Sequence, residues 1–112
     1  MREIYLAVHF LRQLKPLLKK YPNLQDDLIY SLKNFNKDLV ISLGHKLYKL
    51  RLKSSDLPKV KSKSIRVIVF LWEIRNTLVP ITIYFKGDSE NVSQRELEYH
   101  FDKILNEVRS GN

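Results

Sequence analysis

The sequence predicts one α+β domain in which helices pack on an antiparallel sheet of about four strands. Two apolar stripes with helical spacing come first, several short strand-like segments follow, and a further helical stripe ends the chain. Helices that are segregated from a run of strands are typical of α+β domains. A chain of 112 residues has enough material for one hydrophobic core. We therefore expect a single domain over residues 1–112 in the order β-α-α-β-β-β-α.

The first part of the chain predicts a short strand and a helical hairpin. Residues 3–7 form the expected strand, and apolar residues at intervals of three and four predict a helix over residues 7–21. Pro16 lies inside this helix and predicts a kink or a restart there, because proline removes one backbone donor. Asn23 is expected to cap a second helix, which has an apolar stripe formed by Leu24, Leu28, Leu32 and Phe35.

The middle of the chain has the most informative pattern. Residues 36–44 show no period and predict a loop with a turn at Gly44. From His45 the period becomes two, which predicts a strand with an apolar face and a cationic face. The apolar residues are Tyr48, Leu50 and Leu52, and the cations are Lys49, Arg51 and Lys53. Because like charges repel and uncharged polar residues would suit solvent equally well, this pattern favours binding of an anion.

Two further strands follow. β-Branched and aromatic residues over Ile65–Trp72 predict a strand that is apolar on both faces and lies at the centre of the sheet, with Arg66 as its only charge. Residues 73–76 are expected to form a hairpin turn. Thr77–Lys86 then predicts the last strand, in which Pro80 indicates a bulge or an edge position because it cannot donate to the ladder.

The last predicted element is a helix that runs to about Arg109. Ser93 and Glu96 match a capping box, and Val92 and Leu97 are spaced as a hydrophobic staple. The apolar face of this helix consists of Leu97, Phe101, Ile104, Leu105 and Val108.

The charge of the chain is unevenly distributed. The formal net charge is +8, and His45 to Arg66 contains eight basic residues and one acid, so that +7 falls within this segment. A concentrated basic segment attracts polyanions and speeds their association. We expect nucleic acid or an acidic segment of a partner protein as the ligand; the alternative is a solvated basic face that only aids solubility.

Several classes of function are disfavoured by what the sequence lacks. It has no cysteine, no metal motif, no glycine-rich phosphate loop and no nucleophile elbow, and His9, His45 and His100 are far apart. We therefore expect neither a metal nor a cofactor. The N-terminus has no apolar stretch like that of a signal peptide, and no segment approaches a membrane span. These features predict a cytoplasmic protein without membrane contact.

The candidate site combines groups from three expected strands. In an antiparallel meander they can converge on one patch of the sheet, where clustered cations stabilise a phosphate and its transition state. The candidate catalytic residues are Arg51, Lys53, Arg66, Tyr84 and Lys86, and the candidate RNA-binding residues are Lys46, Lys49, Lys59, Lys61 and Lys63. The structural alternatives are solvated strand lysines, a half-buried Tyr84, and an ion pair of Arg66 with Glu73, Glu96 or Glu98.

Such a patch suits RNA in particular. The 2′-hydroxyl of RNA can attack the adjacent phosphate when the enzyme supplies positioning, charge stabilisation and proton transfer. None of these needs a metal, a histidine or a cysteine. Repulsion between neighbouring cations lowers the pKa of a lysine, and a tyrosine near cations can donate or accept a proton.

Several segments, in this order, resemble the RelE/HigB branch of the RelE/ParE toxins of bacterial toxin–antitoxin pairs. The resemblance covers nearly the whole chain. The similar segments are Glu-Ile-Tyr-Leu near the N-terminus, Leu-Leu-Lys-Lys-Tyr-Pro at the end of the first helix, Leu47-Tyr48-Lys49-Leu50-Arg51-Leu52-Lys53, Arg66-Val67-Ile68 and Leu78-Val79-Pro80-Ile81-Thr82-Ile83-Tyr84-Phe85-Lys86, before a short acidic loop and a C-terminal helix.

The resemblance implies a fold, an activity and partners. It implies a helical hairpin packed on an antiparallel sheet and cleavage of mRNA in the decoding site of the ribosome. The active residues of the family match Arg51, Lys53, Arg66, Tyr84 and Lys86. Some members have a catalytic tyrosine or histidine near the C-terminus, for which Tyr99 and His100 are candidates, with the surface of the last helix as the alternative place. The implied partners are a cognate antitoxin, in a hetero-oligomer, together with the ribosome and mRNA.

Two other functions remain open. Family members often have glycine-rich sequence before the third-strand arginine, where this chain has Lys63-Ser64-Ile65. This difference favours a non-nucleolytic relative, either a gyrase inhibitor of the ParE kind or a module that only binds an antitoxin. The basic segment alone is also consistent with a general RNA-binding domain.

Overall fold

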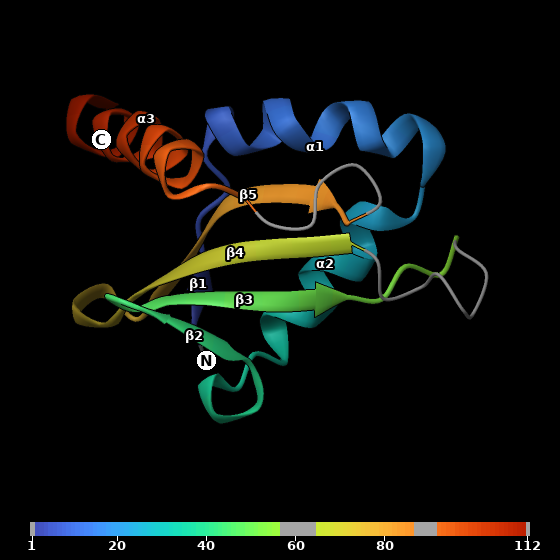
Figure 1. Cartoon of the computed structure of the whole chain (residues 1–112), viewed down its shortest axis with the longest axis horizontal. Coiled ribbons are helices and arrows are strands. Elements are labelled where there is room, and N and C mark those ends of the chain that lie inside the picture. Colours follow the sequence, from blue (N-terminus) through green and yellow to red (C-terminus); the bar gives the residue numbers. More distant parts are fainter. Residues whose placement is uncertain (1, 57–64, 87–91, 112) are drawn as a thin grey trace.

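The computed structural model describes residues 2–56, 65–86 and 92–111. In this part of the chain, three α-helices pack on a five-stranded mixed sheet (Figure 1). The elements are β1 (Glu3–Ile4), α1 (Val8–Lys20), α2 (Leu24–Lys33), the 3₁₀ turn η1 (Lys37–Leu39), β2 (Ile41–Gly44), β3 (Leu47–Leu52), β4 (Ile65–Trp72), the 3₁₀ turn η2 (Glu73–Arg75), β5 (Thr77–Phe85) and α3 (Gln94–Gly111). The predicted α+β class is confirmed.

The strands lie in the order β1-β5-β4-β3-β2, so β4 is central, as its apolar sequence predicts. The pairs among β2, β3, β4 and β5 are antiparallel, whereas β1 runs parallel to β5 and pairs only with Thr77 and Leu78. The sheet is therefore mixed, and the expectation of a purely antiparallel sheet is wrong in this detail. β1 has only two residues, and its local sequence does not indicate the direction in which it pairs with another strand.

The predicted loop over residues 36–44 is wrong in part, because Ile41–Gly44 forms β2. This strand pairs with β3 through Ile41–Lys49 and Ser42–Tyr48, and its residues are all exposed. Ile41 and Leu43 do alternate with Ser42 and Gly44, but four residues directly after the apolar pair Leu39-Val40 are too few for the period to be recognised. The predicted turn at Gly44 is confirmed, since Gly44 has φ +85° and begins the hairpin turn.

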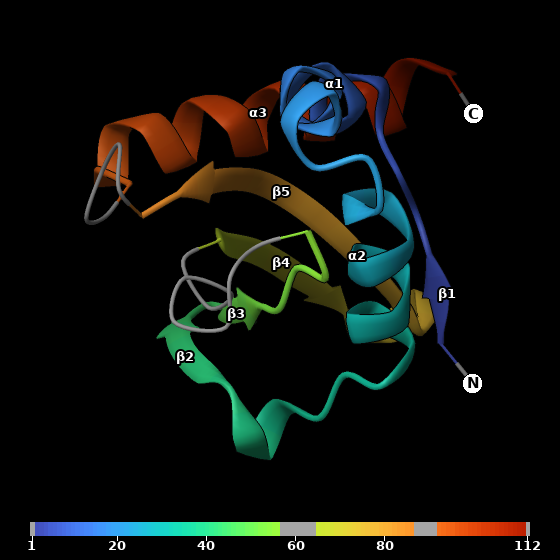
Figure 2. The ribbon, with the colours of Figure 1, turned by 90° about the vertical axis from the view of Figure 1, so that its right-hand side faces the viewer.

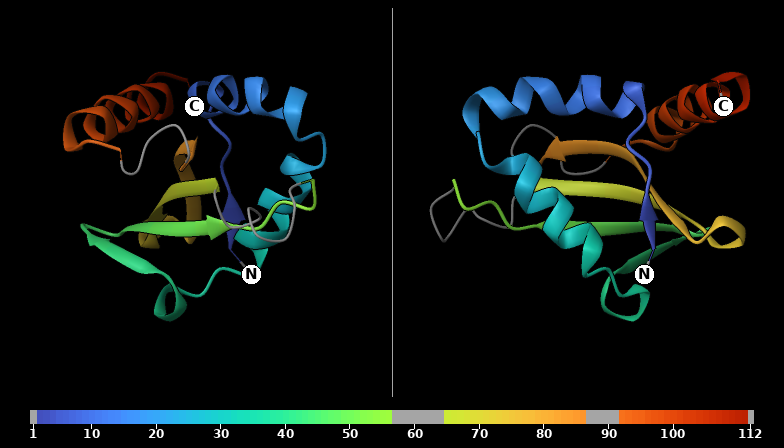
Figure 3. Two further views of the ribbon diagram at one scale, coloured as in Figure 1. Left: turned by 45° about the vertical axis from the view of Figure 1, so that its right-hand side comes forward. Right: turned by 180° about the vertical axis from the view of Figure 1, so that it is seen from behind.

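Two faces of the sheet are covered by different helices. α2 lies behind β3 and β4, α3 lies on the opposite face, and α1 runs along β5 (Figures 1 and 2; Figure 3, right). We call these faces the α2 face and the α3 face. On the α2 face the Phe35 ring packs edge-on against the Tyr48 ring, with 5.5 Å between the ring centroids. On the α3 face the rings of Phe70 and Phe101 pack in the same way, with 5.3 Å between their centroids.

The predicted bulge at Pro80 is confirmed, and a side chain of α1 forms hydrogen bonds with it. Val69 pairs with Pro80 and Ile68 with Thr82, so Ile81 is the extra residue of β5. The Gln13 side-chain amide donates to the Ile81 carbonyl (2.9 Å) and accepts from the Thr82 hydroxyl (2.6 Å). These bonds fix α1 against the sheet. The helix itself runs from Val8 to Lys20 across Pro16, so a restart at that proline is wrong.

Asn23 does not cap α2 with its side chain, contrary to the prediction. Its main-chain and side-chain N–H groups instead donate to the Asp56 carboxylate, both at 2.8 Å. Asp27, in the first turn of α2, accepts from the Ser55 main chain at 2.9 Å. The segment after β3 is thereby tied to the start of α2. The predicted capping box of α3 is confirmed, since Ser93 Oγ accepts from the Glu96 main chain at 3.1 Å.

Glu107 of α3 caps the N-terminus of α1. Its carboxylate accepts from the main-chain N–H groups of Val8 (2.7 Å) and His9 (3.3 Å) and from the Tyr5 hydroxyl (3.4 Å). The first N–H groups of a helix have no partner within it, and Ala7 at the N-cap has no side-chain acceptor. The negative charge is also favourable at the positive end of the helix dipole. Glu107 therefore holds the two helices together.

We expect Glu107→Ala to lower the free energy of unfolding by about 1–2 kcal/mol, the effect of losing a helix cap. Urea denaturation followed by circular dichroism measures this change. Asn106→Ala, at the adjacent exposed position of α3, is the control and should be close to neutral. Equal midpoints for the two variants would show that the cap does not stabilise the fold.

Candidate functional site

Three of the predicted site residues form a row across the sheet. Arg51 of β3 lies opposite Arg66 of β4, and Arg66 lies opposite Tyr84 of β5. Residues directly opposite each other project to the same side of a sheet, so all three side chains belong to the α3 face. Arg51 is exposed, Tyr84 is half-buried, and Arg66 is only 7% exposed. The predicted convergence of these residues is thus present in the structure.

The row combines two positive charges with a neutral phenol. Burial lowers the pKa of Arg66, the nearby Arg51 charge lowers it further, and Tyr84 acts in the opposite direction. Guanidinium groups nevertheless remain protonated in proteins. Burial raises the pKa of Tyr84, an effect that Arg66 and a hydrogen bond with the Val92 main chain partly offset. The row can therefore offer an anion two guanidinium groups and a protonated hydroxyl.

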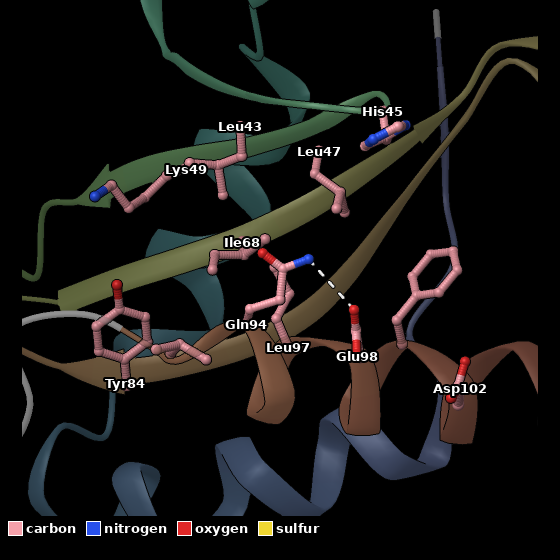
Figure 4. Close-up of a pocket in the computed structure, with 12 residues that line it drawn as sticks. Leu43, His45, Leu47, Lys49, Ile68, Tyr84, Gln94, Leu97, Glu98 and Asp102 are labelled. Carbon is pink, nitrogen blue, oxygen red and sulfur yellow. Dashed lines mark hydrogen bonds between the residues drawn. The ribbon is translucent and has the colours of Figure 1, made fainter.

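A pocket of about 500 Å³ opens beside this row, between the α3 face and α3 itself. Its walls include the apolar side chains Leu43, Leu47, Ile68, Val92, Leu97 and Phe101, and its polar residues are His45, Lys49, Tyr84, Gln94, Glu98 and Asp102. Figure 4 shows the Lys49 ammonium and the Tyr84 hydroxyl directed toward the same end of the pocket. This end adjoins Arg66, because Arg66 and Tyr84 are register partners.

The acidic wall of the pocket is a part of the site that the sequence analysis missed. Gln94, Glu98 and Asp102 follow one another at intervals of four along α3 and form one stripe that lines the pocket. The Gln94 side-chain amide donates to Glu98 at 3.3 Å (Figure 4). The spacing is visible in the sequence as a polar stripe beside the apolar one, but an exposed helix face has the same pattern.

Lys53 and Lys86 lie near the row without joining the pocket. Lys53 follows β3 and, with Arg51, lines a second cavity of about 580 Å³ that also includes Asp27 and Tyr30. In this region β3 extends past β2, whose last pair with β3 is Ile41–Lys49. Lys86 is exposed directly after β5. Both lysines can therefore reach a ligand that extends beyond the row.

Lys46 does not lie with the other predicted RNA-binding residues. It occupies the β2–β3 turn, at the end of β3 opposite to Arg51, where its ammonium is 2.7 Å from Glu73. This ion pair raises the pKa of Lys46 and lowers that of Glu73. Glu73, one of the expected ion-pair partners of Arg66, thus lies at the opposite end of the sheet from that arginine. Lys59, Lys61 and Lys63 lie outside the described residues.

Tyr99 and His100 belong to the contact between α3 and α1. A ring nitrogen of His100 lies 2.8 Å from His9 Nε2, so one imidazole donates to the other. Tyr99 packs edge-on against both rings. Neither Tyr99 nor His100 lines the pocket beside the row. The hydrogen bond between His100 and His9 acts together with the Glu107 cap and strengthens the attachment of α3 to α1.

The comparison with protein-family models finds no match, and the comparison with curated proteins finds no relative. Among the described residues, no group of three or more metal-ligating side chains can hold a metal ion. No helix in the described ranges is long and apolar enough to cross a membrane. The function is therefore inferred from the row, the pocket and their chemistry.

The histidine pair predicts acid sensitivity of the α1–α3 contact. Burial lowers the pKa of both histidines. At His9, Lys103 and Arg12 lower the pKa further and Glu107 raises it. At His100, His9 lowers the pKa further and Glu96 raises it. The unfolded chain then binds more protons than the folded chain near pH 6.5. Stability from this contact is therefore complete above the unfolded pKa and is lost as the pH falls through it toward the folded pKa.

We expect the melting temperature to fall between pH 8 and pH 5, and to fall less in a variant with His9→Gln and His100→Gln. Differential scanning fluorimetry across this range measures both slopes. His45→Gln, which removes an exposed histidine outside the contact, should keep the slope of the unaltered protein. An unchanged slope in the double variant would contradict a role of the pair in acid sensitivity.

Proposed function

We propose that this protein is a cytoplasmic toxin of a type II toxin–antitoxin pair that cleaves mRNA on the ribosome. The single observation that supports the proposal most is the row Arg51–Arg66–Tyr84, in register on three adjacent strands. A row of this kind fits a phosphodiester, because each guanidinium presents a planar fork of donors to phosphate oxygens. Lys49, Arg51, Lys53 and Arg66, four of the eight cations between His45 and Arg66, would attract a polyanionic strand to the same part of the sheet.

The proposed reaction uses the nucleophile of RNA itself. The 2′-oxygen forms a bond to the adjacent phosphorus, the bond from phosphorus to the 5′-oxygen breaks, and a 2′,3′-cyclic phosphate remains. Arg66 and Arg51, with Lys53 at the end of β3, stabilise the extra negative charge of the pentacoordinate transition state. Preorganised cations on a rigid sheet need no rearrangement during the reaction. This is the part of catalysis that the row supplies.

Proton transfer is assigned to the end of β5. The raised pKa of Tyr84 keeps the phenol protonated at neutral pH, so that it can give a proton to the departing 5′-oxygen. Lys86, directly after the strand, is assigned to the same end of the reaction, where its ammonium donates to an oxygen of the reacting phosphate; the proton of the 2′-hydroxyl passes to water. The nucleotide thus lies across the row, with its departing oxygen toward β5.

The proposed protein partner is an antitoxin with an acidic segment. Such a segment would complement the cations of the α3 face and exclude RNA from the row. Arg51 also lies on the part of β3 that extends past β2, and an edge of this kind is where an extended segment of a partner can add a strand. Toxin and antitoxin would then form a hetero-oligomer in which the site is covered.

We expect induction of the protein without its antitoxin to arrest growth and to produce mRNA 5′ ends at codon spacing. Arg51→Ala and Arg66→Lys should reduce the cuts at least about tenfold, because the first removes a charge-assisted contact to the phosphate and the second removes the paired donors of the guanidinium. Arg66→Lys keeps the charge but loses the fork. Lys15→Ala, at an exposed cation of α1, is the matched control and should leave the cuts unchanged.

Two results would contradict the proposal. One is growth without arrest and without cuts, and the other is unchanged cuts in both arginine variants. Growth arrest with intact mRNA would favour the non-nucleolytic alternative instead, and inhibition of supercoiling by purified gyrase would then support a gyrase inhibitor. Harmless expression with weak, salt-sensitive binding to any RNA would favour a general RNA-binding domain.

A further inference from the structure

The pocket beside the row has two ends of different character. One end has the Lys49 ammonium and the Tyr84 hydroxyl and adjoins Arg66 (Figure 4). The remainder is apolar on its floor, also includes His45, and is bounded by the α3 stripe of Gln94, Glu98 and Asp102, in which the Gln94 amide donates to Glu98. Its volume of about 500 Å³ lies within the range of sites for small ligands, about 300–1,000 Å³. A nucleotide has the same division between a charged phosphate and a flat, largely apolar base.

The charges restrict how a nucleotide can enter. A phosphate is attracted to the cationic end and repelled by Glu98 and Asp102. The base must then occupy the apolar part, over Leu47 and Ile68 and beside Phe101, where its face can pack on apolar and aromatic side chains. In this position its edge meets the carboxylates of α3, which accept hydrogen bonds but cannot donate them.

We propose that this pocket takes one unpaired base of the RNA beside the row and selects bases that have an exocyclic amino group. This inference rests on the proposed function. Cytosine, adenine and guanine each present amino hydrogens to Glu98 and Asp102. Uracil presents two carbonyl oxygens around a single N–H. Its carbonyl oxygens would therefore face the carboxylate oxygens of α3, and both are hydrogen-bond acceptors. The α3 stripe is therefore a specificity element, separate from the groups that hold the phosphate.

Cytosine and uracil provide the sharpest comparison, because they have almost the same size and stacking surface and differ only at positions 3 and 4 of the base edge. Binding of 2′-O-methylated hexanucleotides of cytidine and of uridine to the whole protein is measured by fluorescence anisotropy at one salt concentration. The methyl group prevents 2′-hydroxyl attack, so binding is seen without cleavage. We expect the cytidine strand to bind about tenfold more tightly, the effect of good base-edge hydrogen bonds.

Replacing the carboxylates should remove this preference. In a variant with Glu98→Ala and Asp102→Ala, the two strands should bind within about twofold of each other. Glu98→Gln, which keeps the shape of the side chain, provides a second test if the double variant loses its circular dichroism spectrum, and it should weaken the preference. Asp26→Asn, at an exposed acid of α2 away from the pocket, is the control and should keep the preference.

The outcomes separate this inference from the proposed function. Equal binding of cytidine and uridine strands, with loss of both in Arg51→Ala, would overturn the base pocket and leave the phosphate row intact. A cytidine preference that persists without the carboxylates would also overturn it. Absence of binding to either strand would overturn the inference together with the proposed function. A preference that disappears with the carboxylates alone would support it.

Discussion

The antiparallel register of β3, β4 and β5 determines where the functional groups of this protein lie. β4 is buried along most of its length, with Ile65, Val67 and Val69 fully enclosed on the α2 face. A shift by one residue would turn every side chain of a neighbouring strand to the other face, and would move the cations of β3 into the core. Burial of a charge without a partner is costly, so the core itself enforces the register that aligns Arg51 and Arg66.

The second constraint is the attachment of α3, which forms one wall of the pocket. Near its C-terminal end, Glu107 caps α1. About two turns earlier in the helix, His100 bonds to His9 and the adjacent Phe101 packs on Phe70 of the sheet. The helix is therefore held at points that follow Glu98 in the chain, and the distance between its acidic stripe and the cationic row depends in part on the contacts of Glu107 and His100, which lie outside the pocket.

Much of the fold could be predicted because buried residues recur at regular intervals along most of the helices and strands. The alternation of β3, the apolar run of β4 and the bulge at Pro80 each follow from local sequence. β2 could not be predicted, because its alternation covers only four residues, all of them exposed. The cap by Glu107 joins residues at opposite ends of the chain, and nothing local indicates such a pair. Arg51, Arg66 and Tyr84 were found because strand parity aligns them, whereas Lys46 was misplaced because charge density does not indicate the direction of a turn.

The central claim is that the row on the α3 face binds a phosphodiester, and the salt dependence of binding tests it directly. For a 2′-O-methylated RNA strand, the logarithm of the binding constant falls with the logarithm of salt concentration, with a slope set by the number of phosphate contacts. If Arg51 contacts a phosphate, Arg51→Ala should reduce this slope by about one, whereas Lys15→Ala should leave it unchanged. Equal slopes for Arg51→Ala and the unaltered protein would contradict the claim.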